Sequence, residues 1–273
     1  MPDSIPRTSP RVAAIAMRSV PDLEASLEEA ERWVERAVRD GAEAVGLPEN
    51  FPRISLTPAE GVQAASLEAD RALAWLSTTA RRHGIVMWGG LHVPAMAGKV
   101  HNTLVVVDAR GQEVTRYRKR HLFDVSLGGH DEHRESAHVE PGQEVVTADL
   151  GSLGTWGLAI CYDLRFPEHF RAREAHVWTV PAAFLTRTGA AHWHVLLRAR
   201  AIENQAFVVA PAQAGQHHPT RRSHGHALIV DPWGTVLADT GPEPGVAIAR
   251  LDFAWLAEVR RGLPALMHRL PSG

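Results

Sequence analysis

Apolar residues in the first third of the chain alternate between short unbroken runs and helical periodicity. The run RVAAIAM at residues 11–17 has the length of a strand. Over residues 21–40 the apolar positions recur at helical spacing, which predicts an amphipathic helix. The same order returns with the run AEAVGL at 42–47, a helical stretch at 72–83 and the run IVMWGGLHV at 85–93. The pattern predicts strand, helix and strand in repeated units.

The rest of the chain adds a hairpin, further strands and one long helix. VHNTLVVVD at 100–108 and EVTRYRK at 113–119 flank the turn-rich DARGQ, which is typical of a hairpin. Five later runs also have the composition of buried strands: GTWGLAIC, HVWTVP, AFVVAP, HALIVD and GVAIARL. A helix at about 191–205 interrupts them. Strands alternating with helices predict a layered α/β fold with mixed sheets covered by helices.

Length and composition favour one domain preceded by a short tail. The opening MPDSIPRTSP is rich in Pro, Ser and charge, so residues 1–10 are predicted to form a flexible tail. A chain of 273 residues with 45% hydrophobic content can bury one large core. Because no linker or composition break follows, residues 11–273 are predicted to form a single domain.

Charge and hydropathy exclude two classes of partner. The chain has 29 basic and 31 acidic residues, and no basic run is dense enough to follow a phosphate backbone, so nucleic acid is not an expected partner. The run VAAIAM is too short for a signal-peptide core, and no stretch reaches the roughly 18 apolar residues of a membrane span. We therefore predict no membrane partner and a cytoplasmic location.

Three residues that can carry chemistry stand at predicted strand ends, where a rigid sheet positions the loops. Glu49 follows an apolar strand and a proline, although such a fragment is also typical of a surface loop acid. Lys119 ends the hairpin strand within the basic run RYRKRH, and a lysine in such a run is usually a solvated edge charge. Cys161, the single cysteine, ends a very apolar strand and is either inert core or a nucleophile.

The sixteen histidines raise two competing hypotheses, a metal site and a Cys-His enzyme. The paired histidines stand in AHWH at 191–194, QHH at 216–218 and HGH at 224–226. None of these pairs has a recognised zinc spacing with a third ligand. We therefore predict no metal site, and a Cys-His mechanism would require a histidine such as His192 to be as indispensable as Cys161.

Three separated motifs, PENF around Glu49, YRKRHLFDV around Lys119 and ICYDLRFPE around Cys161, together resemble the nitrilase superfamily of carbon–nitrogen hydrolases. The similarity continues through ES and PG at 135–142, PAAFLTRTGAAHW, LLRARAIENQ, APAQAGQHH and GHALIVDPWG, so it covers nearly all of residues 11–251. The later motifs look most like the Nit branch, which includes omega-amidases and amidases of deaminated glutathione. The resemblance implies a four-layer αββα sandwich of the nitrilase type, with two mixed sheets flanked by helices, usually assembled as a homodimer or a higher homo-oligomer.

The resemblance also implies residue roles. The catalytic residues would be Glu49 as base, Lys119 as cation and Cys161 as nucleophile, with Glu135 as an auxiliary glutamate. Lys119 and the backbone N–H of Tyr162 would stabilise the oxyanion. The implied reaction is hydrolysis of the primary amide of a small carboxylated substrate, through a thioester and with release of ammonia. It would require no metal or organic cofactor.

Substrate contacts are expected in the segment that follows a strand end near the nucleophile. The candidates are Thr186, Arg187, Thr188, His192 and Trp193, although all could be ordinary loop and helix-start residues. Arg187 is a candidate anchor because guanidinium can bind a carboxylate with two hydrogen bonds. The favoured substrates are deaminated glutathione or an α-keto acid amide. The alternatives are a nitrile, an N-carbamoyl amino acid, or an inactive binding protein on the same fold.

Overall fold

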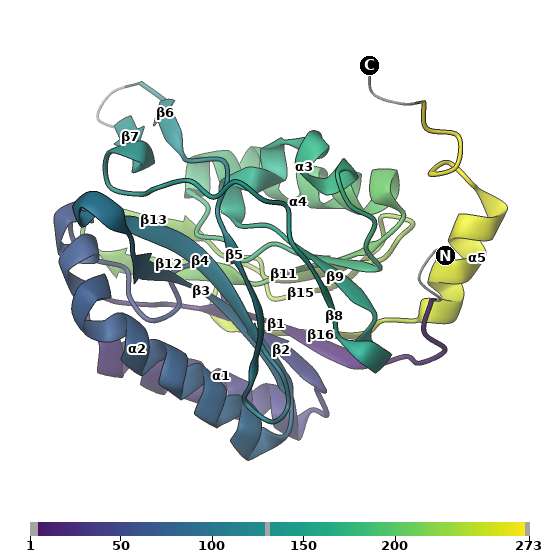
Figure 1. The fold of residues 1–273 in the computed structure, drawn as a ribbon, viewed down its shortest axis with the longest axis horizontal. Helices are drawn as coiled ribbons and strands as arrows, with labels where there is room; N and C mark the ends of the chain where they lie inside the picture. The colour runs from purple at the N-terminus through teal and green to yellow at the C-terminus, as the bar shows by residue number, and fades with distance from the viewer. Residues whose placement is uncertain (1–4, 129–131, 271–273) are drawn as a thin grey trace.

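Two mixed sheets pack face to face in the protein, and helices cover their outer faces (Figure 1). The computed structural model describes residues 5–128 and 132–270. The larger sheet contains β1 (Arg11–Met17), β2 (Ala44–Gly46), β3 (Val86–Pro94), β4 (Val100–Val107), β5 (Glu113–Arg118), β12 (Ala212–His218), β13 (Arg221–His224) and β16 (Gly245–Arg250). The smaller sheet contains β8 (Thr147–Asp149), β9 (Thr155–Leu158), β10 (Val177–Thr179), β11 (Phe207–Ala210), β14 (Leu228–Val230) and β15 (Val236–Asp239). A separate hairpin pairs β6 (Asp124–Ser126) with β7 (Glu132–Arg134).

Most of the α-helices lie on the two opposite sides of this pair of sheets, and the last one, near the C-terminus, lies at one end of the molecule, as Figure 1 shows. The α-helices are α1 (Leu23–Arg39), α2 (Pro58–His83), α3 (Pro167–Arg171), α4 (Thr186–Asn204) and α5 (Phe253–Gly262). Short 3₁₀ turns are η1 (Met96–Gly98), η2 (Glu135–Ala137), η3 (Gly151–Leu153) and η4 (Cys161–Arg165). Helices α1 and α2 cover the larger sheet, and α3 and α4 cover the smaller one. The predicted four-layer αββα sandwich is therefore confirmed.

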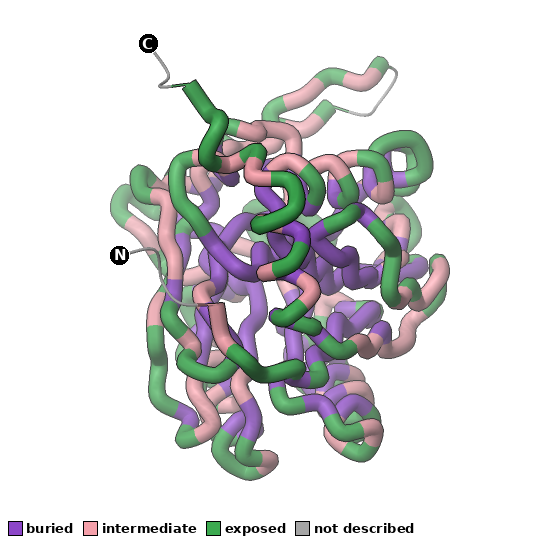
Figure 2. The backbone as a smooth tube through the Cα atoms, turned by 90° about the vertical axis from the view of Figure 1, so that its right-hand side faces the viewer, coloured by how far each residue is buried: buried purple, intermediate pink, exposed green. Residues whose placement is uncertain are grey.

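Strand β1 shows why the sandwich has four layers. Its side chains alternate between the two faces of the sheet, and both faces are buried. Ala13 and Ile15 pack with α1 and α2, whereas Ala14 belongs to the core that continues into the smaller sheet. Trp88 and Trp156 join the sheets, with ring centroids 4.7 Å apart. Figure 2 shows this buried backbone running through the middle of the molecule.

Two predicted helices begin too late. Helix α2 begins at Pro58 rather than residue 72, because Thr57 caps its N-terminus by accepting a hydrogen bond from the N–H of Glu60. The early turns bury only small residues such as Ala65, which carry little apolar periodicity. Helix α4 begins at Thr186 rather than residue 191. The consequence is that the predicted substrate segment is largely helical.

The two ends of the chain are only partly described. Residues 5–10 form no helix or strand, but the Thr8 hydroxyl donates to the carbonyl of Ser152 at 2.6 Å. Residues 1–4 and 271–273 lie outside the described residues. The flexible tail at 1–10 and the single domain at 11–273 therefore stay predictions. Among the helices of the described chain, none is long and apolar enough to cross a membrane.

Candidate active site

The Glu49 loop is fixed against β3 by backbone hydrogen bonds. The N–H of Gly90 donates to the carbonyl of Pro48, and the N–H of Phe51 donates to the carbonyl of Gly90. A Cβ atom on Gly90 would meet the Cα of Glu49 at 2.8 Å, so only glycine permits this approach. Buried Gln213 donates to the carbonyl of Glu49 at 3.1 Å. Glu49 therefore sits on a loop held from two strands.

Lys119 follows β5 and points into the protein. Alternation along β5 buries Tyr117 and Lys119 while Arg118 is exposed, so the basic run contains one interior cation. The backbone N–H of Lys119 donates to the carbonyl of Asn102, which continues the pairing with β4. The side chain of Lys119 is only 2% exposed. A solvated edge charge is therefore excluded.

Cys161 stands at a sharp change of direction rather than within a strand. Strand β9 ends at Leu158, and Cys161 opens η4 with a φ of 47°, a left-handed conformation that non-glycine residues rarely adopt. Its N–H donates to the carbonyl of Pro181. The next N–H, that of Tyr162, belongs to the first turn of η4, where helical N–H groups lack acceptors within the helix.

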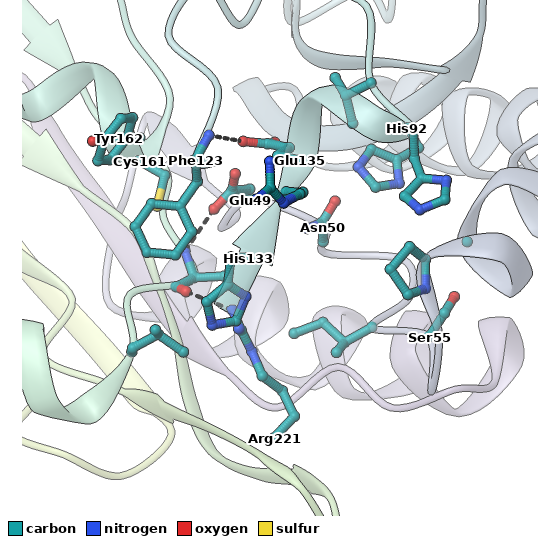
Figure 3. A pocket seen from close by; sticks show the side chains of 18 of the residues that line it. Glu49, Asn50, Ser55, His92, Phe123, His133, Glu135, Cys161, Tyr162 and Arg221 are labelled. Carbon is teal, nitrogen blue, oxygen red and sulfur yellow. Dashed lines mark hydrogen bonds between the residues drawn. The ribbon is translucent and has the colours of Figure 1, made fainter. Parts of the chain in front are cut away.

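Glu49, Lys119 and Glu135 form a buried ionic cluster, and Figure 3 shows Glu49 beside Cys161. The Lys119 Nζ lies 3.1 Å from Glu49 Oε1 and 2.9 Å from Glu135 Oε2. Asn102 Nδ2 donates to Oε1 of both carboxylates, at 2.8 and 3.2 Å. The other oxygen of Glu49 accepts the N–H of Ala183 at 2.8 Å. These contacts fix the orientation of the Glu49 carboxylate.

Charge and burial set the resting protonation states. Burial favours the neutral acid in Glu49, but the Lys119 charge and hydrogen bonds from Cys161, Asn102 and Lys119 outweigh it and lower its pKa. Burial disfavours the ammonium, yet Glu135 and Glu49 raise the pKa of Lys119 well above its ordinary value. Burial and the Glu49 charge raise the pKa of Cys161 well above its ordinary value. At neutral pH a protonated thiol therefore faces a carboxylate that can accept its proton.

Glu135 is fixed by the segment that precedes it. Its Oε2 accepts the N–H of Phe123 at 2.6 Å, which joins η2 to the chain that leaves Lys119. The loop before Glu135 includes residues 129–131, which lie outside the described residues. The expected auxiliary glutamate thus contacts Lys119 directly, and Figure 3 places it beside Glu49.

A buried carboxylate that the sequence analysis missed joins the elements carrying Lys119 and Cys161. Asp163 is fully buried and accepts hydrogen bonds from the Tyr117 hydroxyl at 2.7 Å and the N–H of Ile160 at 2.9 Å. It also accepts the backbone N–H of His121 at 3.1 Å and its ring Nδ1 at 2.7 Å. One side chain therefore fixes β5 to the turn of the nucleophile. The polar DLR step after the apolar strand was its signal in the sequence.

The site opens into a pocket of about 420 Å³, within the range typical of small-molecule sites. Of the five predicted substrate contacts, Thr188 lines this pocket. Trp193 is 1% exposed and packs on Phe184, while the guanidinium of Arg187 donates to the carbonyl of Leu127. Thr186 and His192 also lie outside the lining residues. These four therefore do not border the pocket, and their role as substrate contacts stays a prediction.

Arg221 is a pocket cation that the sequence did not predict. It projects from β13 towards the Glu49–Cys161 group, as Figure 3 shows. Its Nη2 donates to the carbonyl of Ala183, and the remaining guanidinium N–H groups border the pocket. Burial lowers its pKa, while the charges of Glu49, Cys161 and Glu135 raise it. No motif marked it, because an arginine pair after a polar turn carries no pattern specific to a site.

The partner of the thiol is a carboxylate rather than an imidazole. In the described part of the chain, the groups that shift the pKa of Cys161 are Glu49, Lys119 and the N–H of Ala183. The ring of His192 faces Arg165 at 3.3 Å instead. The geometry therefore favours a Glu-Lys-Cys arrangement over the Cys-His alternative.

Comparisons with known proteins agree with this arrangement. The family model described as carbon-nitrogen hydrolase matches residues 11–261. Deaminated glutathione amidase of Synechocystis is 46% identical over 267 residues, which is 94% of this chain and 97% of that protein.

Solved structures show the same fold. The NitFhit protein of C. elegans superposes with a TM-score of 0.90 at 37% identity, covering 96% of this chain and 65% of that longer one. An amidase from Nesterenkonia, with acrylamide added at its active-site cysteine, has a TM-score of 0.78 at 26% identity, covering 93% and 98%. The neighbours therefore include an amidase whose active site contains a cysteine.

Proposed function

Since the chain belongs to the carbon–nitrogen hydrolase family and is an amidase of the nitrilase superfamily, we propose that it hydrolyses an amide of a small 2-oxo dicarboxylate through a thioester on Cys161. The observation that carries this proposal is the approach of a buried carboxylate, an ammonium and a thiol at one end of the pocket. Deaminated glutathione is the favoured substrate, because the Synechocystis relative is named for it.

In the first half-reaction Glu49 accepts the thiol proton while the sulfur of Cys161 bonds to the amide carbon. The carbonyl electron pair moves onto oxygen, where Lys119 and the N–H of Tyr162 stabilise the oxyanion, at about 3 kcal/mol for each donor. When the oxyanion collapses, the carbon–nitrogen bond breaks and protonated Glu49 gives its proton to the leaving nitrogen. A thioester and a free amine result.

In the second half-reaction water replaces the amine. Glu49 takes a proton from water, the hydroxide oxygen bonds to the thioester carbon, and the same donors stabilise the second oxyanion. Collapse breaks the carbon–sulfur bond, and the thiolate recovers a proton from Glu49. Glu135 holds Lys119 in place throughout, because its Oε2 contacts the ammonium at 2.9 Å and also accepts the N–H of Phe123 at 2.6 Å.

The pocket suits an anionic substrate. Arg221 can offer guanidinium N–H groups to a carboxylate, a role that the sequence analysis had assigned to Arg187. Arg165 lies at the same pocket, over the rings of Tyr162 and Phe184. These two cations line the pocket, which fits a substrate that carries carboxylates.

The leaving group depends on which amide is cleaved. Deaminated glutathione has N-substituted amides, so its hydrolysis would release a peptide amine rather than ammonia. Ammonia, which the sequence analysis expected, would form only from a primary amide such as α-ketoglutaramate. The two products separate the candidate substrates directly.

The test is a panel of deaminated glutathione, α-ketoglutaramate, a simple nitrile and an N-carbamoyl amino acid, with amine and ammonia measured separately. We expect amine release from deaminated glutathione, complete loss in Cys161→Ala, and a loss of about 10³-fold or more in Glu49→Gln. Arg221→Met should raise KM more than it lowers kcat. Arg250→Met is the control, because Arg250 is exposed and does not line the pocket. Turnover of the nitrile or carbamoyl substrate alone, or activity in Cys161→Ala, would reject the proposal.

Two further parts of the proposal concern assembly and location. Val195 and Ile202 on α4 are 66% and 48% exposed, and Trp233 nearby is 57% exposed. Ile202 packs close to Gly234, so these side chains lie on one surface, which suits burial in a homodimer. Light scattering should give twice the chain mass. The cytoplasmic location stays a prediction.

A further inference from the structure

A second cluster of chemistry-bearing side chains lies outside the pocket, between α4 and the end of β15. It consists of His194, His226 and Asp239, here called the exposed trio. His194 Nε2 lies 2.8 Å from Asp239 Oδ2, and His226 Nδ1 lies 3.0 Å from the same oxygen. One nitrogen or oxygen from each residue lies within 4.8 Å of the others. The hydrolysis mechanism uses none of them.

The backbone holds the exposed trio in place through hydrogen bonds among its own segments. The N–H of His226 donates to the carbonyl of Gly241 at 2.7 Å, and its carbonyl accepts Trp193 Nε1 at 2.8 Å. Trp193 is the neighbour of His194 on α4, and the N–H of Gly241 donates to Asp239 Oδ1 at 2.8 Å. All three side chains therefore start from mutually fixed positions, which is what a binding site requires.

A third histidine supports the exposed trio from behind. The ring of His224 stacks on the ring of His226, with centroids 4.6 Å apart and planes inclined by 26°. A Cβ on Gly189 would meet His224 Cγ at 2.4 Å, so the glycine lets this ring lie against α4. His224 Nε2 is buried and has no hydrogen-bond partner in the described part of the chain. His224 therefore supports the ring of His226 by stacking and is not itself one of the trio's ligand atoms.

We propose that His194, His226 and Asp239 bind a divalent transition-metal ion of the Zn²⁺ class. Two imidazoles and a carboxylate suit Zn²⁺, and tetrahedral Zn–N and Zn–O bonds of about 2.1 Å place ligand atoms about 3.4 Å apart. The present separations of 2.8 and 3.0 Å need to open by only a few tenths of an ångström. Side-chain exposures of 36%, 23% and 26% leave room for that movement and for water as the fourth ligand.

The ion would act as a structural clamp. It would join α4 to the segments on either side of β14. In the sequence, Asp239 lies 13 residues after His226 and 45 residues after His194. Helix α4 also carries Thr188 to the pocket, so the clamp would fix the helix that forms part of the pocket wall. The inference does not depend on the proposed substrate, because its readouts are binding and stability.

The experiment titrates metal-free protein with Zn²⁺ by calorimetry, in a Cys161→Ala background that removes the competing thiol. We expect one ion per chain, a thermal midpoint raised by several degrees, and visible absorption typical of tetrahedral coordination when Co²⁺ replaces Zn²⁺. Asp239→Asn and His226→Gln should each weaken binding at least about 10-fold. His268→Gln removes an exposed histidine outside the trio and should leave binding unchanged.

Two results would overturn the proposal. One is the absence of Zn²⁺ binding to folded protein, which would make the trio an ordinary hydrogen-bonded group. The other is equal affinity in Asp239→Asn, His226→Gln and the background protein, which would place the ion elsewhere. His194→Gln, on the accessible side of α4, keeps the test decisive if another variant does not fold.

Discussion

Two aspartates in this protein each lie between two histidines, and their surroundings give them opposite roles. The groups are His121–Asp163–His169, here called the buried trio, and His194–His226–Asp239, the exposed trio. In both, potential ligand atoms lie within 4.8 Å of one another. Side-chain composition alone therefore does not tell them apart.

The difference lies in what else each aspartate binds. Asp163 is 0% exposed and accepts four hydrogen bonds, two of them from backbone N–H groups. In the buried trio His169 donates its Nε2 to the carbonyl of Leu158 at 2.9 Å. Asp239 accepts from two imidazoles and one backbone N–H, and its side chain is 26% exposed. The four hydrogen bonds to Asp163 leave its carboxylate no free position for a metal ion. The carboxylate of Asp239 can bind an ion in place of the N–H groups of the two imidazoles.

Two properties distinguish the roles of these His–Asp contacts: whether the hydrogen-bonding positions of the aspartate are all occupied, and whether solvent reaches the side chains. The buried trio connects β5 to the turn of Cys161, so it serves the active site by fixing distances. The exposed trio connects three segments only through side chains that solvent can reach. We therefore expect changes in the buried trio to reduce stability and activity, and changes in the exposed trio to affect metal binding.

The largest effect is expected for Asp163→Asn. The amide would direct an NH₂ group at donors that now face an oxygen, inside a site without water access. Breaking such a buried charged network costs about 3 kcal/mol in the free energy of unfolding. Urea unfolding should show that loss, and kcat should fall together with it because Cys161 loses its support. A folded variant with unchanged kcat would show that Asp163 does not position the nucleophile.

A smaller effect is expected for Tyr117→Phe. This change removes one of the four hydrogen bonds to Asp163 and leaves the ring in its place. The free energy of unfolding should fall by about 1.5 kcal/mol, since the bond is to a charged acceptor. Chemical denaturation measures it. A change below a few tenths of a kcal/mol would mean that the remaining donors compensate fully.

The pH dependence of stability should come from buried histidines. Burial lowers the pKa of His169, so the unfolded chain binds its proton first as the pH falls. Its contribution is complete above about pH 6.5 and decreases as the pH falls through the folded pKa. Unfolding measured from pH 7 to 5 should show this loss, and His169→Gln, which keeps a donor for Leu158, should reduce it.

Some acid sensitivity should persist in that variant. Burial also lowers the pKa of His217 to about 4. The protein should therefore also lose the stability that neutral His217 contributes as the pH falls from about 6.5 towards 4. His268→Gln controls for the removal of one histidine. An unchanged pH slope in His169→Gln would show that His169 does not contribute.

The sequence predicted the layered fold and the candidates Glu49, Lys119 and Cys161 because short stretches of neighbouring residues indicate both. Strand β1 is apolar on both faces, and each motif stands at a strand end. Strand β12 was not predicted, because it contains Gln213 and His217, which are polar yet buried through hydrogen bonds to Ser19. Ser19 lies 194 residues before Gln213 and 198 residues before His217, beyond any local pattern.

The rest of the site depends on tertiary contacts. The start of α4 determines that Thr188 reaches the pocket and Arg187 does not, and Arg221 enters only because β13 pairs with β12. The histidine pairs lacked a third ligand in the sequence, and Asp239 supplies one from a strand 13 residues after His226. Long-range pairing, rather than residue type, carries this information.

The smallest effect is expected for Asp239→Asn in metal-free protein. Partly exposed ion pairs contribute at most about 1 kcal/mol, so the free energy of unfolding should change by less than that. The asparagine keeps an oxygen for the N–H of Gly241. Urea unfolding beside Asp163→Asn measures the contrast, and adding Zn²⁺ should stabilise the background protein but not this variant. If Asp239→Asn and Asp163→Asn lowered the free energy of unfolding equally without metal, the exposed trio would also be part of the structural framework. Its accessibility to solvent would then not distinguish the two roles.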